Sequence, residues 1–197
     1  VAAVDTSGSL RVWNVGDGKV ECKDTGQNGW ARSVAVSPDG ERVAVGYSDG
    51  TVKVLDIESN QEVARYPGHS GGAYEVSYSG DGTFLAVTGG DGSLSVWHTK
   101  KKGADGGPLL LDRLERDCKT GKATFRPGGD ELAFGSSDGT VRIYNWKTRK
   151  ETQVQGMDNM PQELNQEFQV GPVRWDASGN LLRGASATGT CREWRFN

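Results

Sequence analysis

The sequence predicts an all-β fold made of one repeated unit, and two observations carry this prediction. A small turn ending in glycine recurs along the chain, each time before a short apolar run that ends in an aromatic residue or leucine. The glycines are about 42 to 50 residues apart and are Gly8, Gly50, Gly92, Gly139 and Gly189. Between these turns, short segments alternate apolar and polar residues, as half-buried strands do. A period in the forties that is filled by short strands is typical of the blades of a β-propeller.

Residues 31–66 are the clearest copy of the unit and predict four antiparallel strands. The expected strands are 31–36, 42–46, 51–55 and 62–66. The turn before the second strand contains Pro38, which fixes φ, and Asp39 with Gly40, which supply the positive φ of a tight reversal. Asp49 opens a hairpin turn of the same kind. The fourth strand is short and polar, which suits an outer edge that must resist pairing with other chains.

The repeat extends along the whole chain, so residues 1–197 are expected to be one propeller segment with four complete blades and a partial one. The expected repeats are 1–22 for the partial blade, and 31–66, 73–100, 122–154 and 170–197 for the others. Because the sequence begins in the middle of a repeat and stops just past a third strand, we expect the segment to be part of a larger propeller, whose remaining blades are then its first partners. The alternative is a small closed ring of about five blades.

The ends of the third strands and one Gly-His pair add a more specific pattern. The pair is Gly68-His69, and the strands end in Trp13-Asn14, Leu55-Asp56, Trp97-His98, Tyr144-Asn145 and Trp194-Arg195. This pattern resembles the WD40 repeat family, although the Trp-Asp pair that names the family is never complete. In the family, a His, the Asp of the later turn and the Trp form a buried hydrogen-bond network, and only His69, Asp91 and Trp97 match all three positions. The resemblance implies that His69 is structural rather than a ligand or base, since a buried imidazole needs a partner.

Two segments show a narrower resemblance. Residues 31–46 and residues 132–144 are similar to blades of the echinoderm-microtubule-associated-protein-like family, whose long arrays of degenerate blades often lack the Trp-Asp pair. That resemblance implies a cytoskeletal component that binds the microtubule lattice. The alternative is any divergent member of the wider WD40 family.

The composition argues against several classes of function. The net charge is −3, so the chain lacks the basic character that a general nucleic-acid binder needs. No apolar run has membrane length, and no secretory signal is seen. The three cysteines, Cys22, Cys118 and Cys191, are scattered without the C-x-x-C spacing of a zinc site. We expect each to be a small buried hydrophobic residue in a reducing compartment, which predicts a cytoplasmic protein.

The sequence contains no recognisable catalytic centre. It has no G-x-S-x-G motif, P-loop or dinucleotide fingerprint. With two histidines, His69 and His98, a His-based metal site or catalytic triad is not expected. Glycine-rich stretches such as residues 89–92 precede strands, so they lack the helix N-terminus that binds phosphate. We therefore expect no enzymatic activity, no cofactor and no bound metal.

The expected function is a non-enzymatic protein–protein interaction scaffold, in which rigid blades present several loops to one partner. Anchors of such interfaces are often aromatic residues or arginine. Trp30, Arg32 and Tyr74 stand at the start of inner strands and are the candidate partner-binding residues. The alternative is that they pack between blades at the rim.

The alternative function is a microtubule-associated, cytoskeletal component. Lys100, Lys101 and Lys102 begin an expected long loop at residues 100–108 and would meet an acidic surface such as that of tubulin. Salt would weaken this contact, because exposed ion pairs are screened. A second long loop is expected at residues 157–168. The plainer interpretation of both loops is that their charges are simply solvated.

Overall fold

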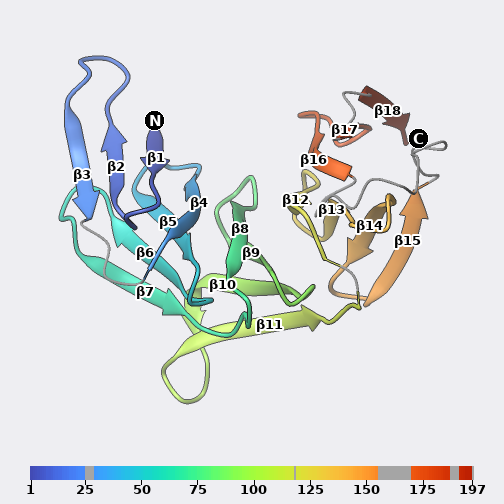
Figure 1. The fold of residues 1–197 in the computed structure, drawn as a ribbon, viewed down its shortest axis with the longest axis horizontal. Helices are drawn as coiled ribbons and strands as arrows, with labels where there is room; N and C mark the ends of the chain where they lie inside the picture. The colour runs from blue at the N-terminus through green and yellow to red at the C-terminus, as the bar shows by residue number, and fades with distance from the viewer. Residues whose placement is uncertain (25–28, 118, 155–169, 187–190, 197) are drawn as a thin grey trace.

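The chain folds into five antiparallel sheets that follow one another along an arc (Figure 1). The computed structural model describes residues 1–24, 29–117, 119–154, 170–186 and 191–196. These residues contain 18 strands and no helix, so the expected all-β fold is confirmed. The sheets that contain the first and the last strands lie at opposite ends of the arc. Consecutive sheets of three or four strands arranged in this way are consistent with propeller blades.

Each sheet pairs its strands in chain order, so that sequential strands are neighbours. The first two sheets consist of β1 (Ala2–Val4), β2 (Leu10–Trp13) and β3 (Val20–Asp24), and of β4 (Ala31–Val36), β5 (Arg42–Tyr47), β6 (Val52–Asp56) and β7 (Glu62–Tyr66). The third sheet consists of β8 (Ala73–Tyr78), β9 (Phe84–Gly89), β10 (Leu94–Lys102) and β11 (Pro108–Leu114). The last two consist of β12 (Thr124–Phe125), β13 (Glu131–Gly135), β14 (Val141–Asn145) and β15 (Lys150–Val154), and of β16 (Val170–Trp175), β17 (Leu181–Ser186) and β18 (Cys191–Arg195).

The strand predictions hold closely in the second sheet. β4 and β7 begin and end where the alternation places them, and β5 and β6 differ from the expected ranges by one residue. The third sheet extends further than expected, because β11 follows the predicted end of that repeat at residue 100. The expected loop 100–108 is wrong for the lysine triplet 100–102, since these residues continue β10, which pairs with β11. Residues 103–107 do form the connection between these two strands. The second expected loop, 157–168, lies outside the described residues.

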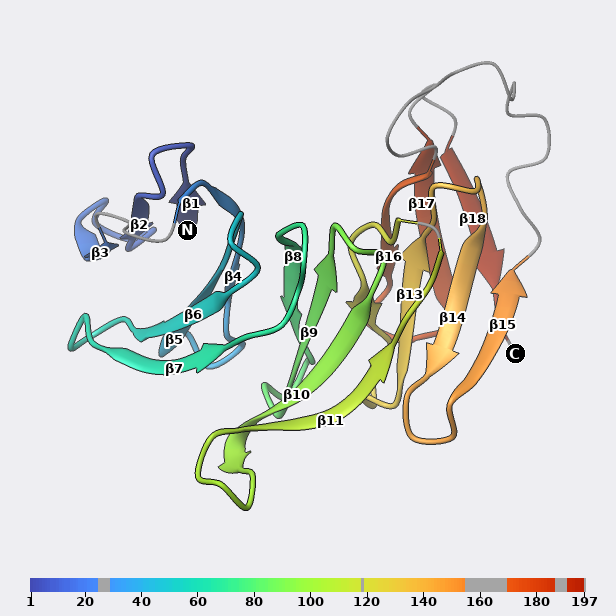
Figure 2. The same ribbon diagram turned by 60° about the horizontal axis from the view of Figure 1, so that its bottom comes forward.

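Four clusters of buried side chains hold each sheet against the next one. In the first cluster, Leu10 and Val12 of β2 pack with Val43 and Val45 of β5. The other clusters are built in the same way from valine, alanine and leucine, each with at least one buried aromatic residue. Figure 2 shows the strands of the third sheet lying beside those of the fourth. Because each sheet buries its faces only against its neighbours, the stability of the array is close to a sum of local terms.

The recurring turns are held by a carboxylate that accepts hydrogen bonds from the residue two positions later. Asp49 Oδ1 accepts from the backbone N and from Oγ1 of Thr51 at 2.9 and 2.7 Å. The same pair of bonds recurs in the first, third and fourth sheets. Glycine is required at Gly50, where φ is +88° and a Cβ would lie 1.9 Å from the carbonyl oxygen of His69. The turn of the second sheet therefore contacts the loop into the third sheet and helps to position His69.

Candidate functional site

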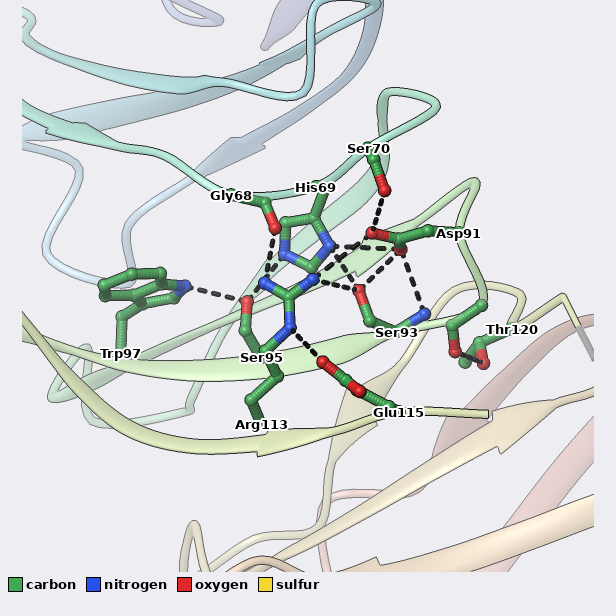
Figure 3. A network of polar contacts seen from close by, with 11 residues as sticks. Gly68, His69, Ser70, Asp91, Ser93, Ser95, Trp97, Arg113, Glu115 and Thr120 are labelled. Carbon is green, nitrogen blue, oxygen red and sulfur yellow. Dashed lines mark hydrogen bonds and ion pairs between the residues drawn. The ribbon is translucent and has the colours of Figure 1, made fainter. Parts of the chain in front are cut away.

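A buried polar network crosses the third sheet from a turn to the strand β10 (Figure 3). The imidazole of His69 is buried at its centre. Its Nδ1 is 2.8 Å from Oγ of Ser93, and its Nε2 is 2.7 Å from Oγ of Ser95. Trp97 donates its indole N–H to Ser95 over 2.8 Å, and Ser93 donates its hydroxyl to Asp91 over 2.5 Å. The structure thus places His69, Asp91 and Trp97 in one network, linked by two serines.

The directions of these hydrogen bonds determine the tautomer of His69. The hydroxyl proton of Ser93 is donated to Asp91, so the Oγ of Ser93 accepts from Nδ1–H of the imidazole. The Oγ of Ser95 accepts from the indole N–H, and its own proton is donated to Nε2. Every donor therefore has an acceptor when the imidazole is neutral and protonated at Nδ1. A second proton, at Nε2, would deprive the hydroxyl proton of Ser95 of its acceptor.

The electrostatics of the network agree with a neutral imidazole. Burial lowers the pKa of His69 to about 4, although the nearby Asp91 carboxylate acts in the opposite direction. His69 Nδ1 and Asp91 Oδ1 are 3.7 Å apart, so the carboxylate reaches the ring through Ser93 and not by a direct hydrogen bond. Burial alone would raise the pKa of Asp91, but hydrogen bonds from the hydroxyl and backbone N–H of Ser93 outweigh it and lower this pKa. At neutral pH the negative charge of the network is therefore on Asp91.

Arg113 balances the negative charge of Asp91. Its Nη2 lies 3.2 Å from Asp91 Oδ2 and 3.2 Å from Ser93 Oγ, and its Nη1 donates to the carbonyl oxygen of Gly68. Ser70 donates to the same carboxylate over 3.1 Å. Arg113 belongs to β11, a strand beyond the expected end of the repeat, and nothing in its sequence context marks it. This ion pair fastens the outer strand of the sheet to the network.

The arrangement of the network favours structural stability over chemistry. Both imidazole nitrogens are occupied, and a pKa of about 4 makes His69 a weak base at neutral pH. In the part of the chain that the structure describes, no group of three or more His, Cys, Asp or Glu side chains is arranged to hold a metal ion. The network therefore links the loop before β8, the turn at Asp91 and the strands β10 and β11.

The fourth sheet places charged side chains at the equivalent positions. Arg142 stands where the third sheet has Ser95, and its guanidinium lies 2.9 Å from Asp138 and 2.6 Å from Glu151. Arg116 makes a further contact to Glu151 at 2.5 Å. Burial would raise the pKa of Asp138, but hydrogen bonds from the next turn residues and from Arg142 lower it to about 2. At this position, ion pairs connect the strands of the fourth sheet, whereas hydrogen bonds between uncharged groups connect those of the third.

The three candidate partner-binding residues lie at the start of two inner strands, and two of them touch. Arg32 stacks on Tyr74 of the next sheet, with its guanidinium carbon 4.5 Å from the ring centroid. Gly72 leaves room for this stack, since a Cβ there would lie 3.2 Å from Arg32 Nε and from the carbonyl oxygen of Ser48. Trp30 donates its backbone N–H to Ser48 Oγ over 3.1 Å and accepts from Ser48 N over 2.8 Å. The backbone of Trp30 is thus held in place while the residue is 61% exposed.

We call Trp30, Arg32 and Tyr74 the Trp30 surface, and the lysine triplet 100–102 is not part of it. Tyr74 lies near the start of β8, which pairs with the end of β9. The lysines instead follow the point where β10 pairs with the start of β9. The two groups therefore stand at opposite ends of the third sheet. All three lysines are exposed.

The cysteines differ in exposure. Cys22 is buried as expected, whereas Cys191 is exposed, so the expectation of a buried thiol is wrong there. Cys191 begins β18, which is the last strand of its sheet and has a strand neighbour on one side among the described residues. Cys118 lies outside the described residues. Within the described ranges, no helix is long and apolar enough to cross a membrane.

The sheets, the recurring turns and the buried network define a repeat protein built from propeller blades. Two known families match parts of this chain: "WD domain, G-beta repeat" matches residues 60–98, and "Anaphase-promoting complex subunit 4 WD40 domain" matches residues 5–74. A curated relative, the small ribosomal subunit protein RACK1y of Oryza sativa subsp. japonica, is 49% identical over 43 residues. These are 22% of this chain and 13% of the relative, so the chain spans a small part of that protein. Together with the fold, these matches support the WD40 repeat family; the narrower resemblance to microtubule-associated proteins stays a prediction.

Proposed function

We propose that this chain is a non-enzymatic protein–protein interaction scaffold that contacts a partner through the Trp30 surface. The observation that carries the proposal is the exposure of Trp30 beside a preformed stack of Arg32 on Tyr74. Tryptophan, tyrosine and arginine are the residues most enriched among interface hot spots. Because the backbone of Trp30 and the stack are already held, binding costs less conformational entropy than ordering free side chains would.

The exposure of Trp30 favours partner binding over the alternative, in which the three residues only pack between blades at the rim. Arg32 and Tyr74 belong to neighbouring sheets, so their stack contributes to the contact between the sheets. Trp30 is 61% exposed, so its ring adds little to packing within the described residues. A large exposed aromatic side chain on a backbone that Ser48 holds is the kind of residue that anchors an interface.

The matched proteins are consistent with a role in an assembly. The relative is named as a small ribosomal subunit protein, and one matching family is named after subunit 4 of the anaphase-promoting complex. Both names describe components of larger complexes. Repeated blades that rigidly hold several loops would serve this chain in the same general way.

A comparative capture experiment tests the proposal. Tagged wild-type protein and the variants Trp30→Ala, Arg32→Ala and Val15→Ala are used to capture proteins from a cell extract, which are quantified by mass spectrometry. Val15 is an exposed apolar residue in the turn between β2 and β3 and serves as the matched control. We expect a set of proteins that wild type and Val15→Ala retain and that Trp30→Ala loses. Identical sets for all four proteins, or a marked drop in the urea midpoint of Trp30→Ala, would instead favour rim packing.

Microtubule association is the second candidate, and the exposed lysine triplet is the observation that favours it. Among the described residues, no carboxylate oxygen lies within 4.0 Å of the side-chain nitrogen of Lys100, Lys101 or Lys102. Co-sedimentation with polymerised tubulin, for wild type and for a variant with all three lysines changed to alanine, tests this function. We expect binding that weakens with salt and in the variant; no co-sedimentation at low salt would exclude it. A cytoplasmic location belongs to the same proposal, and imaging of the tagged protein checks it.

A further inference from the structure

A narrow basic groove lies between the edge strand β7 and the hairpin formed by β10 and β11. Its volume is about 150 Å³, which corresponds to roughly five water molecules at about 30 Å³ each. Its charged and titratable lining comes from Arg65 of β7 and from His98 and the lysine triplet 100–102 of β10. No carboxylate is among the described residues that line it. The groove is thus wide enough for one or two side chains and prefers negatively charged ones.

A large β-bulge directs the lysines toward this groove. The pairing of β10 with β11 passes from His98 opposite Leu109 directly to Lys102 opposite Pro108, so the residues between them are left without partners in the ladder. The imidazole of His98 stabilises the bulge, because its Nδ1 accepts hydrogen bonds from the backbone N–H groups of Lys100 and Lys101, each over 3.1 Å. Bulges of this kind re-aim side chains and recur next to functional sites. The position of the lysines is therefore fixed by backbone geometry.

Among the described residues, no ion pair includes a lysine of the triplet. A compensating charge is that of Asp39 in the second sheet, whose pKa is lowered mainly by a hydrogen bond from Ser37 and also by the charge of Lys100. Lys53 and Lys147, by contrast, are paired with carboxylates at 2.5 and 2.6 Å. Arg65 in the groove is held by both carboxylate oxygens of Glu62, each at 2.8 Å. The carboxylate of Asp105, in the tip of the hairpin, accepts from the backbone of its own turn. Of the cations in the groove, the lysine triplet is thus the part available to an external anion.

The strand β7 adds a backbone component to the groove. It is the last strand of its sheet and is hydrogen-bonded to β6 on one side. The other edge of Glu62–Tyr66 has no strand neighbour among the described residues. Extended peptides bind such edges by adding a strand, with main-chain hydrogen bonds giving affinity and side-chain contacts giving specificity.

We propose that this basic groove binds an extended acidic segment of a partner protein, with its backbone along β7 and its carboxylates on the lysine triplet 100–102. The site is at the opposite end of the third sheet from the Trp30 surface, so it does not depend on the function proposed for that surface. It also does not depend on microtubules, because any exposed run of glutamate or aspartate supplies the same chemistry.

Fluorescence anisotropy with synthetic peptides tests the charge requirement. The probe is a labelled eight-residue peptide that alternates Glu and Val, and its control has Gln in place of Glu. We expect the full chain to bind the Glu peptide more tightly than the Gln peptide at low salt. The triple variant Lys100→Ala, Lys101→Ala, Lys102→Ala should bind the Glu peptide about tenfold more weakly, since each exposed ion pair contributes a factor of about two to three. The triple Lys→Arg variant should bind like wild type.

Two further measurements test the backbone contacts along β7 and the independence of the groove from the Trp30 surface. A Glu peptide N-methylated at alternate residues keeps its charges but loses backbone donors, and we expect it to bind several-fold more weakly. Trp30→Ala should bind the Glu peptide like wild type, which separates failure of this groove from failure of the Trp30 surface. Equal binding by wild type and the triple alanine variant, with unchanged urea midpoints, would overturn the proposal. Tighter binding of a twelve-residue thymidine oligonucleotide through the same lysines would also overturn it, in favour of a nucleic acid.

Discussion

The third and fourth sheets use different interactions at the same position of the repeat, namely hydrogen bonds in the third sheet and ion pairs in the fourth. In the third sheet Ser95 joins His69 to Trp97 through uncharged hydrogen bonds in a buried place. In the fourth sheet the equivalent residue is Arg142, which pairs with Asp138 and Glu151. Both arrangements link a turn to the strands beyond it. The repeat therefore requires a connection at this position but not a particular set of residues.

This difference has consequences for how each sheet responds to solution conditions. A neutral imidazole inside a network is insensitive to salt but is disrupted when acid adds a proton. Partly exposed ion pairs respond in the opposite way, because salt screens them and their carboxylates keep their charge until strongly acidic pH. The hydrogen bonds of His69, Ser95 and Trp97 can thus be told apart from the ion pairs of the fourth sheet by changing pH and salt separately. The Arg113–Asp91 ion pair of the third sheet, however, should respond to salt as those ion pairs do.

The largest expected effect is a loss of stability in mild acid through His69. Its pKa is lowered from 6.5 to about 4, so between these pH values the unfolded chain binds a proton that the folded chain does not. The contribution of His69 is complete above about pH 6.5 and falls by about 1.4 kcal/mol per pH unit as the pH decreases to about 4, roughly 3 kcal/mol in total. Urea unfolding between pH 7 and pH 4 measures this loss.

Two variants isolate the contribution of His69 to that loss. His98→Gln should keep the dependence on pH, and His69→Gln should lack most of it, even if its midpoint is lower at every pH. The ion pairs of the fourth sheet should add a loss only below about pH 4, because the pKa of Asp138 is lowered from 3.8 to about 2. The same slope in both histidine variants would show that His69 does not control the acid response.

A smaller difference is expected between the turn aspartates of the second and third sheets. Asp91→Ala should lower the free energy of unfolding by about 1–3 kcal/mol, because it removes an acceptor that Ser93 and Arg113 share in a partly buried place. Asp49→Ala should cost less, since Asp49 supports Thr51 in an exposed turn. Comparison of urea midpoints at pH 7 measures both. Equal losses would mean that Asp91 is not coupled to His69 through Ser93.

The smallest expected effect is the response of the fourth sheet to salt. Glu151→Gln removes the acceptor shared by Arg116 and Arg142, and we expect it to cost about 1 kcal/mol or less at low salt. The loss should shrink in 0.5 M salt, at a Debye length of roughly 4 Å. Ser95→Ala in the third sheet is the matched control, and its cost should not change with salt. A salt-independent cost for Glu151→Gln would contradict the charged role of that sheet's network.

The sequence predicts the fold well because its signals are local. Alternation and Asp-Gly turns are read from a few adjacent residues, and the strand β4 begins and ends where they place it. The prediction of a loop at the lysine triplet is wrong for the same reason, because it also rests on adjacent residues alone. Three consecutive lysines break the alternation, and the bulge that keeps them in β10 depends on the imidazole of His98, which the pattern does not reveal.

The site is only partly predictable from the sequence. His69, Asp91 and Trp97 are marked by rare residue types at fixed positions, but the serines that link them are too common to stand out. The sequence pattern implies a direct contact between His69 and Asp91, whereas His69 Nδ1 and Asp91 Oδ1 are 3.7 Å apart. Arg113 comes from another strand, so its contact with Asp91 is set by the sheet and not by sequence spacing.

The protonation of His69 is the most direct test of a neutral network in the third sheet. The chain has two histidines, so long-range ¹H–¹⁵N correlation spectra are simple, and His69→Gln assigns the signals. We predict an imidazole protonated at Nδ1 alone at pH 7, with a titration midpoint near pH 4. A midpoint near 6.5, or a proton on Nε2 instead of Nδ1 at pH 7, would contradict the hydrogen-bond directions described for Ser93 and Ser95.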